Sequence, residues 1–314
     1  VPCKKMEKTV FTQPEVGAYF NERFVCLQLD AEKPENVETA KKYKVEAFPT
    51  LGIIASDGKA ISINAGFVQA AELIEFAKTA LGEMKGFEQY WEDHRKSPQD
   101  LGIQQELLIQ APRFLTTQDS MDAEKWVVRV RKLYKSYLER KMADGSIINK
   151  KDYMIISSLG GNDESETQQM VEYINANLDK WISAVGESAA YYIIEKNDER
   201  MLNLVKDGNI KYKEYLEKIR TDYKKAYDVI KLKHTTPYQK SLDYYDALYA
   251  IYKDKNVSTY IERMKRYLDT LGEDANGSDY ASAAQSLYYA AASKLRPEDH
   301  RQAIAWLEKA IPTE

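Results

Sequence analysis

The sequence predicts two domains of different fold class, an α/β domain over residues 1–84 and an all-helical domain over residues 85–314. In the first region, apolar runs of strand length alternate with segments of helical spacing. After Gly86 the strand-like alternation ends, and one amphipathic helix pattern follows another. The length of 314 residues also suits two domains, each with a core of its own.

The elements expected in residues 1–84 follow the order helix, strand, helix, strand, hairpin, strand, helix. One helix begins at Cys3, and a short one begins at Pro14, a residue suited to a first helical turn. Residues 24–30 form a compact apolar run, which predicts a strand buried on at least one side. Asp57-Gly58 is a strong hairpin signal. The remaining predictions are a helix over 35–43, strands over 45–54 and 59–65, and a helix after Gly66.

Several short motifs stand at a characteristic spacing in this region. Pro2-Cys3-Lys4 opens a helix, Leu29-Asp30 closes a strand, and Phe48-Pro49-Thr50 opens the next strand. The set is completed by Tyr43-Lys44-Val45, Asp57-Gly58-Lys59 and Gly66. Together these motifs resemble the thioredoxin superfamily from its second helix onward. The bacterial envelope group is the most similar, on the basis of Cys3-Lys4-Lys5-Met6-Glu7 and Pro14-Glu15-Val16.

The redox motif of that superfamily is Cys-x-x-Cys, and Val1-Pro2-Cys3 matches its last three positions. The resemblance therefore implies a domain incomplete at its N-terminus, lacking its first strand and helix and the strand that leads into the motif. A sheet without that central strand would expose apolar faces on its neighbours. We therefore expect that the natural protein carries further residues before Val1, including a cysteine directly before it.

The resemblance implies a thiol-disulfide oxidoreductase that acts on protein or peptide disulfides, receives electrons from a partner thiol system and binds no cofactor. Cys3 would be the resolving cysteine, which attacks the mixed disulfide formed by the upstream thiol. A helix start favours this chemistry because its free N–H groups stabilise a thiolate. Pro49 would be cis and lie against the sulfurs, and Phe48 would pair through its backbone with an extended substrate. Pro2, Thr50 and Gly66 complete the predicted substrate-binding set.

Cys26 occupies a place where thioredoxins often carry a lysine near a buried acid. The substitution leaves open an additional thiol near Cys3, although an inert core cysteine is the simpler interpretation. Without an upstream cysteine the whole domain would be redox-inactive, and the protein would be an interaction scaffold with a peptide-binding helical domain. Because disulfides matter mostly in oxidising compartments, the resemblance also places the protein in the bacterial periplasm or cell envelope.

The region after residue 85 predicts roughly ten helices joined by short connections, which favours antiparallel helical hairpins. Pro98, Pro237 and Pro297 each suit a first helical turn, with Ser97 and Thr236 as caps. The last pair, 280–295 and 298–311, resembles a tetratricopeptide hairpin. The residues that fit the second helix of that repeat are Ala303, Leu307, Ala310 and Pro312.

Tyrosine is unusually frequent in the helical region, where 20 of the 23 tyrosines follow residue 100. Adjacent helix positions point about 100° apart, so at most one member of an adjacent pair can sit centrally in a core. The other member would reach a rim or a peptide-binding groove, or tyrosine would simply fill half-buried helix interfaces. The adjacent pairs are Tyr191-Tyr192, Tyr244-Tyr245 and Tyr288-Tyr289.

Composition excludes several other classes of function. A net charge of −4 provides no electrostatic basis for nucleic-acid binding. No apolar run approaches the roughly 20 residues that span a membrane. His94, His234 and His300 are too scattered for a metal site. Asn256 and Asn276 stand in glycosylation triplets, which also arise by chance.

Overall fold

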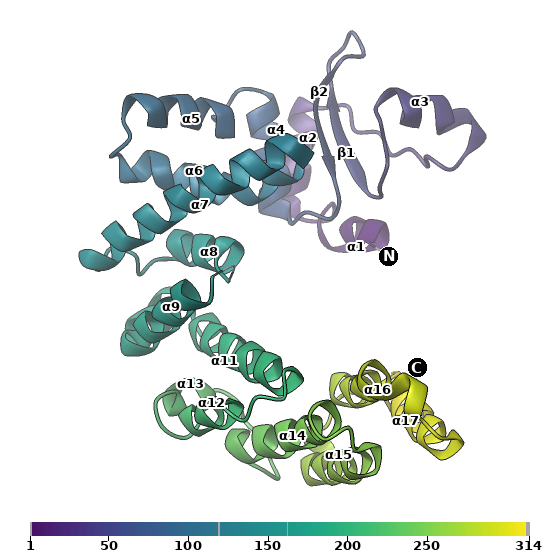
Figure 1. The fold of residues 1–314 in the computed structure, drawn as a ribbon. Coiled ribbons are helices and arrows are strands. Elements are labelled where there is room, and N and C mark those ends of the chain that lie inside the picture. The colour runs from purple at the N-terminus through teal and green to yellow at the C-terminus, as the bar shows by residue number, and fades with distance from the viewer. Residues whose placement is uncertain (1, 119, 162, 312–314) are drawn as a thin grey trace. The chain divides into compact units, whose positions relative to one another are not determined.

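The computed structural model describes residues 2–118, 120–161 and 163–311. The chain divides into two compact units, Val1–Gln118 and Asp119–Glu314 (Figure 1). The first unit contains the only sheet within the described residues, and the second is helical throughout.

The first unit combines small helices with a two-stranded antiparallel sheet. Pro14 occupies the first turn of its helix, as the sequence predicts, and Asp100 caps another by accepting the N–H groups of Gly102 and Ile103. Ser97 and Pro98 were predicted to start that helix, but they precede it, because Asp100 supplies the cap. The elements are α1 (Pro2–Thr9), α2 (Pro14–Arg23), η1 (Pro34–Asn36), α3 (Val37–Lys42), β1 (Thr50–Ile54), β2 (Ala60–Ala65), α4 (Ala70–Ala80), α5 (Phe87–Lys96) and α6 (Leu101–Thr116).

The sheet and the core of this unit follow the predicted hairpin. Thr50 pairs with Ala65 and Gly52 with Ile63, and the connection over 55–59 contains the expected turn at Gly58, whose φ is 78°. Buried residues of α1, α2, β1 and α4 form one hydrophobic cluster beside the hairpin: Met6, Val10, Val16, Ile53, Ala70, Leu73, Phe76 and Ala77. The core thus ties α1 to the sheet and to α4.

The predicted strand over residues 24–30 is wrong. No strand of the described residues pairs with this segment, because β1 pairs only with β2. A strand needs a neighbouring backbone to receive its hydrogen bonds, and without one the apolar alternation produces no ladder and no burial. Val25, Leu27 and Leu29 are accordingly 90%, 80% and 54% exposed.

Helices α5 and α6 belong to the first compact unit, which therefore extends beyond residue 84, where the sequence places the domain boundary. The Arg113 guanidinium of α6 lies over the ring of Phe76 on α4, 4.6 Å from its centroid. The side-chain amide of Gln110 donates to the main-chain oxygen of Lys85 at 3.2 Å. These contacts join α6 to α4 and to the connection that follows it.

The region after residue 85 contains more helices than the sequence predicts: its described residues form thirteen α-helices, α5 to α17, instead of roughly ten, and eleven of them lie in the second unit. One reason is that α9 and α10 are separated only by Asn177, a break without proline or glycine. The helices of this unit are α7 (Ser120–Ala143), α8 (Lys150–Leu159), α9 (Glu164–Ala176), α10 (Leu178–Val185), α11 (Ser188–Lys206), α12 (Tyr212–Lys218), α13 (Lys224–Tyr227), α14 (Pro237–Tyr252), α15 (Val257–Leu271), α16 (Gly277–Ala291) and α17 (Pro297–Ala310), with short 3₁₀ helices η2 (Gly272–Asp274) and η3 (Ala292–Lys294).

The last four helices are regularly spaced. Their N-caps, Thr236, Asn256, Asn276 and Arg296, stand 20 residues apart, so a hairpin repeats every 40 residues. The predicted helical hairpins are confirmed, since α14 packs on α15 and α16 on α17. The side chains of Asn256 and Asn276 accept main-chain N–H groups at 3.0 and 2.8 Å, which gives both glycosylation triplets a structural role. Pro312, which the tetratricopeptide resemblance used, lies outside the described residues.

Tyrosine fills much of the interior between these helices, and the prediction for adjacent pairs is confirmed. Tyr192 and Tyr245 are buried, whereas Tyr191 and Tyr289 are 49% and 83% exposed. Buried tyrosines satisfy their hydroxyls, as Tyr260 does by donating to the main-chain oxygen of Ala283 at 2.7 Å.

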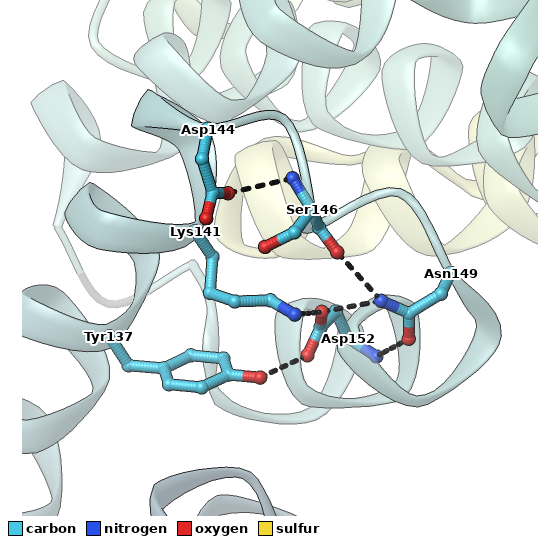
Figure 2. Close-up of polar contacts among 6 residues, drawn as sticks. All are labelled: Tyr137, Lys141, Asp144, Ser146, Asn149 and Asp152. Carbon is cyan, nitrogen blue, oxygen red and sulfur yellow. Dashed lines mark hydrogen bonds and ion pairs between the residues drawn. The ribbon is translucent and has the colours of Figure 1, made fainter. Parts of the chain in front are cut away.

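A buried carboxylate fixes the corner between α7 and α8 (Figure 2). Asp152 is fully buried, and its side chain accepts hydrogen bonds from the Tyr137 hydroxyl and, at 2.6 Å, from the side-chain amide of Asn149. The Lys141 ammonium lies 2.9 Å from the same carboxylate. Because this charge is paired and hydrogen-bonded, the cluster is a structural clamp between the two helices.

Candidate functional site

The predicted resolving cysteine lies in the first turn of α1. Cys3 is half-buried and its thiol is free. The same helix is anchored by Met6 and followed by Val10, both fully buried in the core. The helix start therefore has a fixed position in the unit, although Val1, the first residue of the predicted motif, lies outside the described residues.

The Phe48-Pro49-Thr50 loop is held by two hydrogen bonds at the start of β1. The Phe48–Pro49 peptide bond is cis, as the resemblance implies. The Thr50 hydroxyl donates to the main-chain oxygen of Ala47 at 2.6 Å, and the Gly66 N–H donates to the main-chain oxygen of Pro49 at 2.7 Å. Thr50 and Gly66 thus hold this loop in place. The sequence predicts both as substrate-binding residues and gives no sign of this positioning role.

A contact between α1 and the residue after Gly66 connects the helix to this loop. The Lys5 ammonium lies over the ring of Phe67, 4.9 Å from its centroid. Phe67 follows Gly66, which in turn is hydrogen-bonded to Pro49. The structure therefore links the helix that carries Pro2 and Cys3 to Phe48, Pro49, Thr50 and Gly66. No sequence pattern indicated the Lys5–Phe67 contact.

Phe48 is the most accessible residue of the loop, with 51% of its surface exposed. Within the described residues, neither its N–H nor its C=O takes part in a backbone hydrogen bond. An extended peptide can satisfy such unpaired groups by pairing with them as a strand does. The loop thus offers an apolar side chain and open backbone groups to a polypeptide.

Cys26 departs from its predicted environment. Of the two interpretations, the inert core cysteine is wrong, because Cys26 is exposed and residues 24–30 pair with no strand among the described residues. Its thiol is free. Its proximity to Cys3 remains a prediction.

Other chemistry has little support in the described ranges. No three histidine, cysteine, aspartate or glutamate side chains there gather as metal ligands would. His94 is partly buried, which lowers its pKa, and His300 is hydrogen-bonded to the Tyr288 hydroxyl at 2.9 Å. No helix in the described parts of the chain has the length and apolar character to cross a membrane.

The second unit contains two open hollows beside α8, with volumes of about 310 and 370 Å³. Both are lined by Tyr153 and Ser188. The Tyr153 hydroxyl donates to the main-chain oxygen of Ser188 at 2.7 Å. Tyr191 reaches the first hollow, so one of the adjacent tyrosine pairs does line a depression. Lys196 also lines it, but its charge is paired with Glu195 and Glu199. The hollows therefore indicate no specific ligand.

Comparison with known proteins bears on the first unit alone. No curated protein and no solved structure matched the chain. Residues 1–81 match the family model of a thioredoxin-like domain. This range contains every motif on which the resemblance rests, including Pro2-Cys3-Lys4, Phe48-Pro49-Thr50 and Gly66. The N-terminal part of the chain is therefore similar to thioredoxin-like domains.

Proposed function

We propose that the protein is a thiol-disulfide oxidoreductase that acts on protein or peptide disulfides. The observation that carries the proposal is the combination of a half-buried Cys3 thiol at the start of α1 and a loop in which Phe48 offers unpaired backbone groups. The first supplies a thiol at the start of a helix, and the second supplies a docking edge for an extended chain.

The proposed reaction has two exchange steps. An upstream thiolate attacks the substrate disulfide, forms a mixed disulfide and releases one substrate thiolate. The Cys3 thiolate then attacks the enzyme sulfur of that mixed disulfide, which releases the second substrate thiolate and leaves an enzyme disulfide. A partner dithiol returns the two electrons, and each released thiolate takes up a proton from water. No cofactor takes part.

The proposal requires a second thiol, which the resemblance places directly before Val1. Residues 24–30 support the presence of an additional strand in the natural protein. Val25, Leu27 and Leu29 alternate along this segment and are all exposed, as strand residues without their neighbouring strand would be. An upstream strand that pairs here would supply the neighbouring backbone that this segment lacks among the described residues.

The helical unit would hold a partner or substrate of the redox domain. Its hairpins present tyrosine at accessible positions such as Tyr191 and Tyr289, which suits contacts with polypeptides. We also propose a tetratricopeptide-like character for α16 and α17 and a location in the bacterial periplasm or cell envelope. The location follows from the envelope-type motif and from the need for an oxidising compartment.

An insulin-reduction assay on the natural full-length protein tests the proposal. We expect turnover in the presence of a dithiol donor, and its loss in Cys3→Ser. Cys26→Ser is the matched control, because it removes the other thiol of the sequence and should retain turnover. Equal activity in the wild type and Cys3→Ser would exclude the resolving role.

The second candidate function is a redox-inactive scaffold with a peptide-binding helical domain. It is favoured by the fact that the sequence contains only two cysteines, both free in the structure. Absence of turnover in the natural protein, together with unchanged substrate-peptide binding by Cys3→Ser, would support this candidate.

A further inference from the structure

Helix α1 carries an excess of positive charge in the unit that contains the docking loop. Its residues Pro2–Thr9 include Lys4, Lys5 and Lys8 but only one acid, Glu7. All four charged side chains are exposed. Within the described ranges, no ion pair involves any of the three lysines. Their charge is therefore available to a ligand of this unit.

Lys5 is the lysine that the fold directs towards the loop. Its ammonium lies over the ring of Phe67, 4.9 Å from the ring centroid. Phe67 directly follows Gly66, whose N–H donates to the main-chain oxygen of Pro49 at 2.7 Å. The Phe67 ring is half-buried and packs against the hydrophobic cluster of the unit. Because the ring attracts the cation and is itself held by the core, it keeps the Lys5 charge next to the loop.

The surface around Phe48 combines this charge with apolar groups. Phe48 is 51% exposed, and Phe67 is only partly buried. The three lysines and one glutamate of α1 give a local net charge of +2. Lys44 and Glu46, on the approach to the loop, add one charge of each sign and leave this balance unchanged. The docking surface is therefore apolar and positively charged, although the whole chain has a net charge of −4.

We propose that Lys5 selects polypeptides that carry an acidic residue beside the segment docked at Phe48. The inference rests on the proposed function, which docks an extended substrate on this loop. An apolar side chain of the substrate contacts Phe48, and a neighbouring carboxylate pairs with the Lys5 ammonium. The preferred substrates are disulfides flanked by aspartate or glutamate, whereas lysine or arginine at the same place is disfavoured by repulsion.

Reduction of matched peptides tests this selection. Three cyclic peptides share one disulfide and carry glutamate, glutamine or lysine beside each cysteine. The natural full-length protein reduces them with dithiothreitol as donor, and the rate with dithiothreitol alone is subtracted. The value of kcat/KM should fall about threefold from glutamate to glutamine and again from glutamine to lysine, a step of about 0.65 kcal/mol that suits an exposed ion pair. The preference should shrink at about 1 M salt, which screens exposed charges.

Charge reversal assigns the preference to one residue. Lys5→Glu should invert the order, so that the lysine peptide is reduced fastest, and Lys5→Arg should keep the wild-type order. Lys59→Glu is the matched control, because it changes the net charge equally at an exposed position. Lys59 bonds to Ala55 at the far end of the hairpin, about 17 Å from Thr50, so its reversal should leave the order unchanged. Circular dichroism confirms that each variant is folded.

The outcomes separate this inference from the proposed function. Equal rates for the three peptides, or an order that survives Lys5→Glu, would overturn the selection by Lys5 and leave the oxidoreductase standing. If the natural protein reduces no peptide, the oxidoreductase is refuted, and binding of fluorescent peptides with serine in place of cysteine decides on Lys5 alone. A preference for the glutamate peptide that Lys5→Glu inverts would support the selection, and equal affinities would overturn it.

Discussion

Asp198 on α11 should contribute less stability to the helical unit at neutral than at acid pH. Burial raises the pKa of this carboxyl group to about 6 from 3.8, while the Tyr227 hydroxyl, 3.1 Å from Oδ1, and the Lys240 charge lower it. The folded state therefore binds the proton more tightly than the unfolded state. The stabilisation is fully present below pH 3.8 and is lost as the pH rises through about 6.

The size of the effect follows from the shift. A difference of about two pKa units corresponds to at most about 3 kcal/mol between the two protonation states, and solvent contact of the partly buried side chain reduces it. Asp198→Asn removes the charge and keeps an oxygen that accepts from Tyr227. The variant should therefore match the wild type near pH 4 and exceed its free energy of unfolding by about 1 to 3 kcal/mol at pH 8.

Urea unfolding followed by circular dichroism at pH 4, 6 and 8 measures this difference. Asp269→Asn is the control, since Asp269 is exposed on α15 and its replacement should change little at any pH. A variant that is less stable than the wild type at pH 8, or a difference independent of pH, would refute the reasoning.

Three further predictions concern the clamp, the loop and the exposed thiol. Asp152→Ala leaves the Lys141 ammonium, whose side chain is only 13% exposed, without its buried partner. The variant should lower the free energy of unfolding by about 3 to 5 kcal/mol in urea titrations. A loss below about 1 kcal/mol would contradict the role of Asp152 as a clamp between α7 and α8. The added methyl group of Gly66→Ala meets no atom within 4 Å, but it places a side chain at a φ of 97°. The variant should therefore lose about 1 to 2 kcal/mol of unfolding free energy in the same assay and reduce insulin more slowly. Gly17→Ala, within helix α2, is the control and should be neutral or stabilising. The exposed Cys26 should react with a maleimide faster than the half-buried Cys3, as measured by the rate of labelling at each cysteine. Faster labelling of Cys3 would contradict the burial of these two thiols in the structure.

Local signals predicted much of the fold. Pro14, Asp57-Gly58 and Thr236-Pro237 act through their own backbone geometry, and each lies where the sequence placed it. Residues 24–30 show the limit of such signals. Their alternation describes a strand, but pairing depends on a distant segment, which the local pattern cannot supply.

The helical repeat was missed for a different reason. A tetratricopeptide repeat has a period of about 34 residues, whereas the N-caps here repeat every 20 residues and the hairpins every 40. Asn256 and Asn276, which stand in glycosylation triplets, carry that signal as N-caps. The helix boundaries could have been found from them.

The candidate site was only partly predictable. Cys3, Pro49 and Gly66 were identified by resemblance, and the cis Phe48–Pro49 bond agrees with it. The Lys5–Phe67 contact could not be inferred, because side chains from separate elements meet only in the folded core. The positioning role of Thr50 and Gly66 likewise becomes visible only through their hydrogen bonds in the folded structure.

Trapping of a mixed disulfide tests the central claim most directly. The natural full-length Cys3→Ser protein is incubated with an oxidised substrate peptide, and covalent adducts are measured by mass spectrometry without reductant. If Cys3 resolves the mixed disulfide, the variant accumulates a peptide adduct that dithiothreitol releases, while the wild type does not. Turnover by Cys3→Ser at the wild-type rate, without any adduct, would contradict the account.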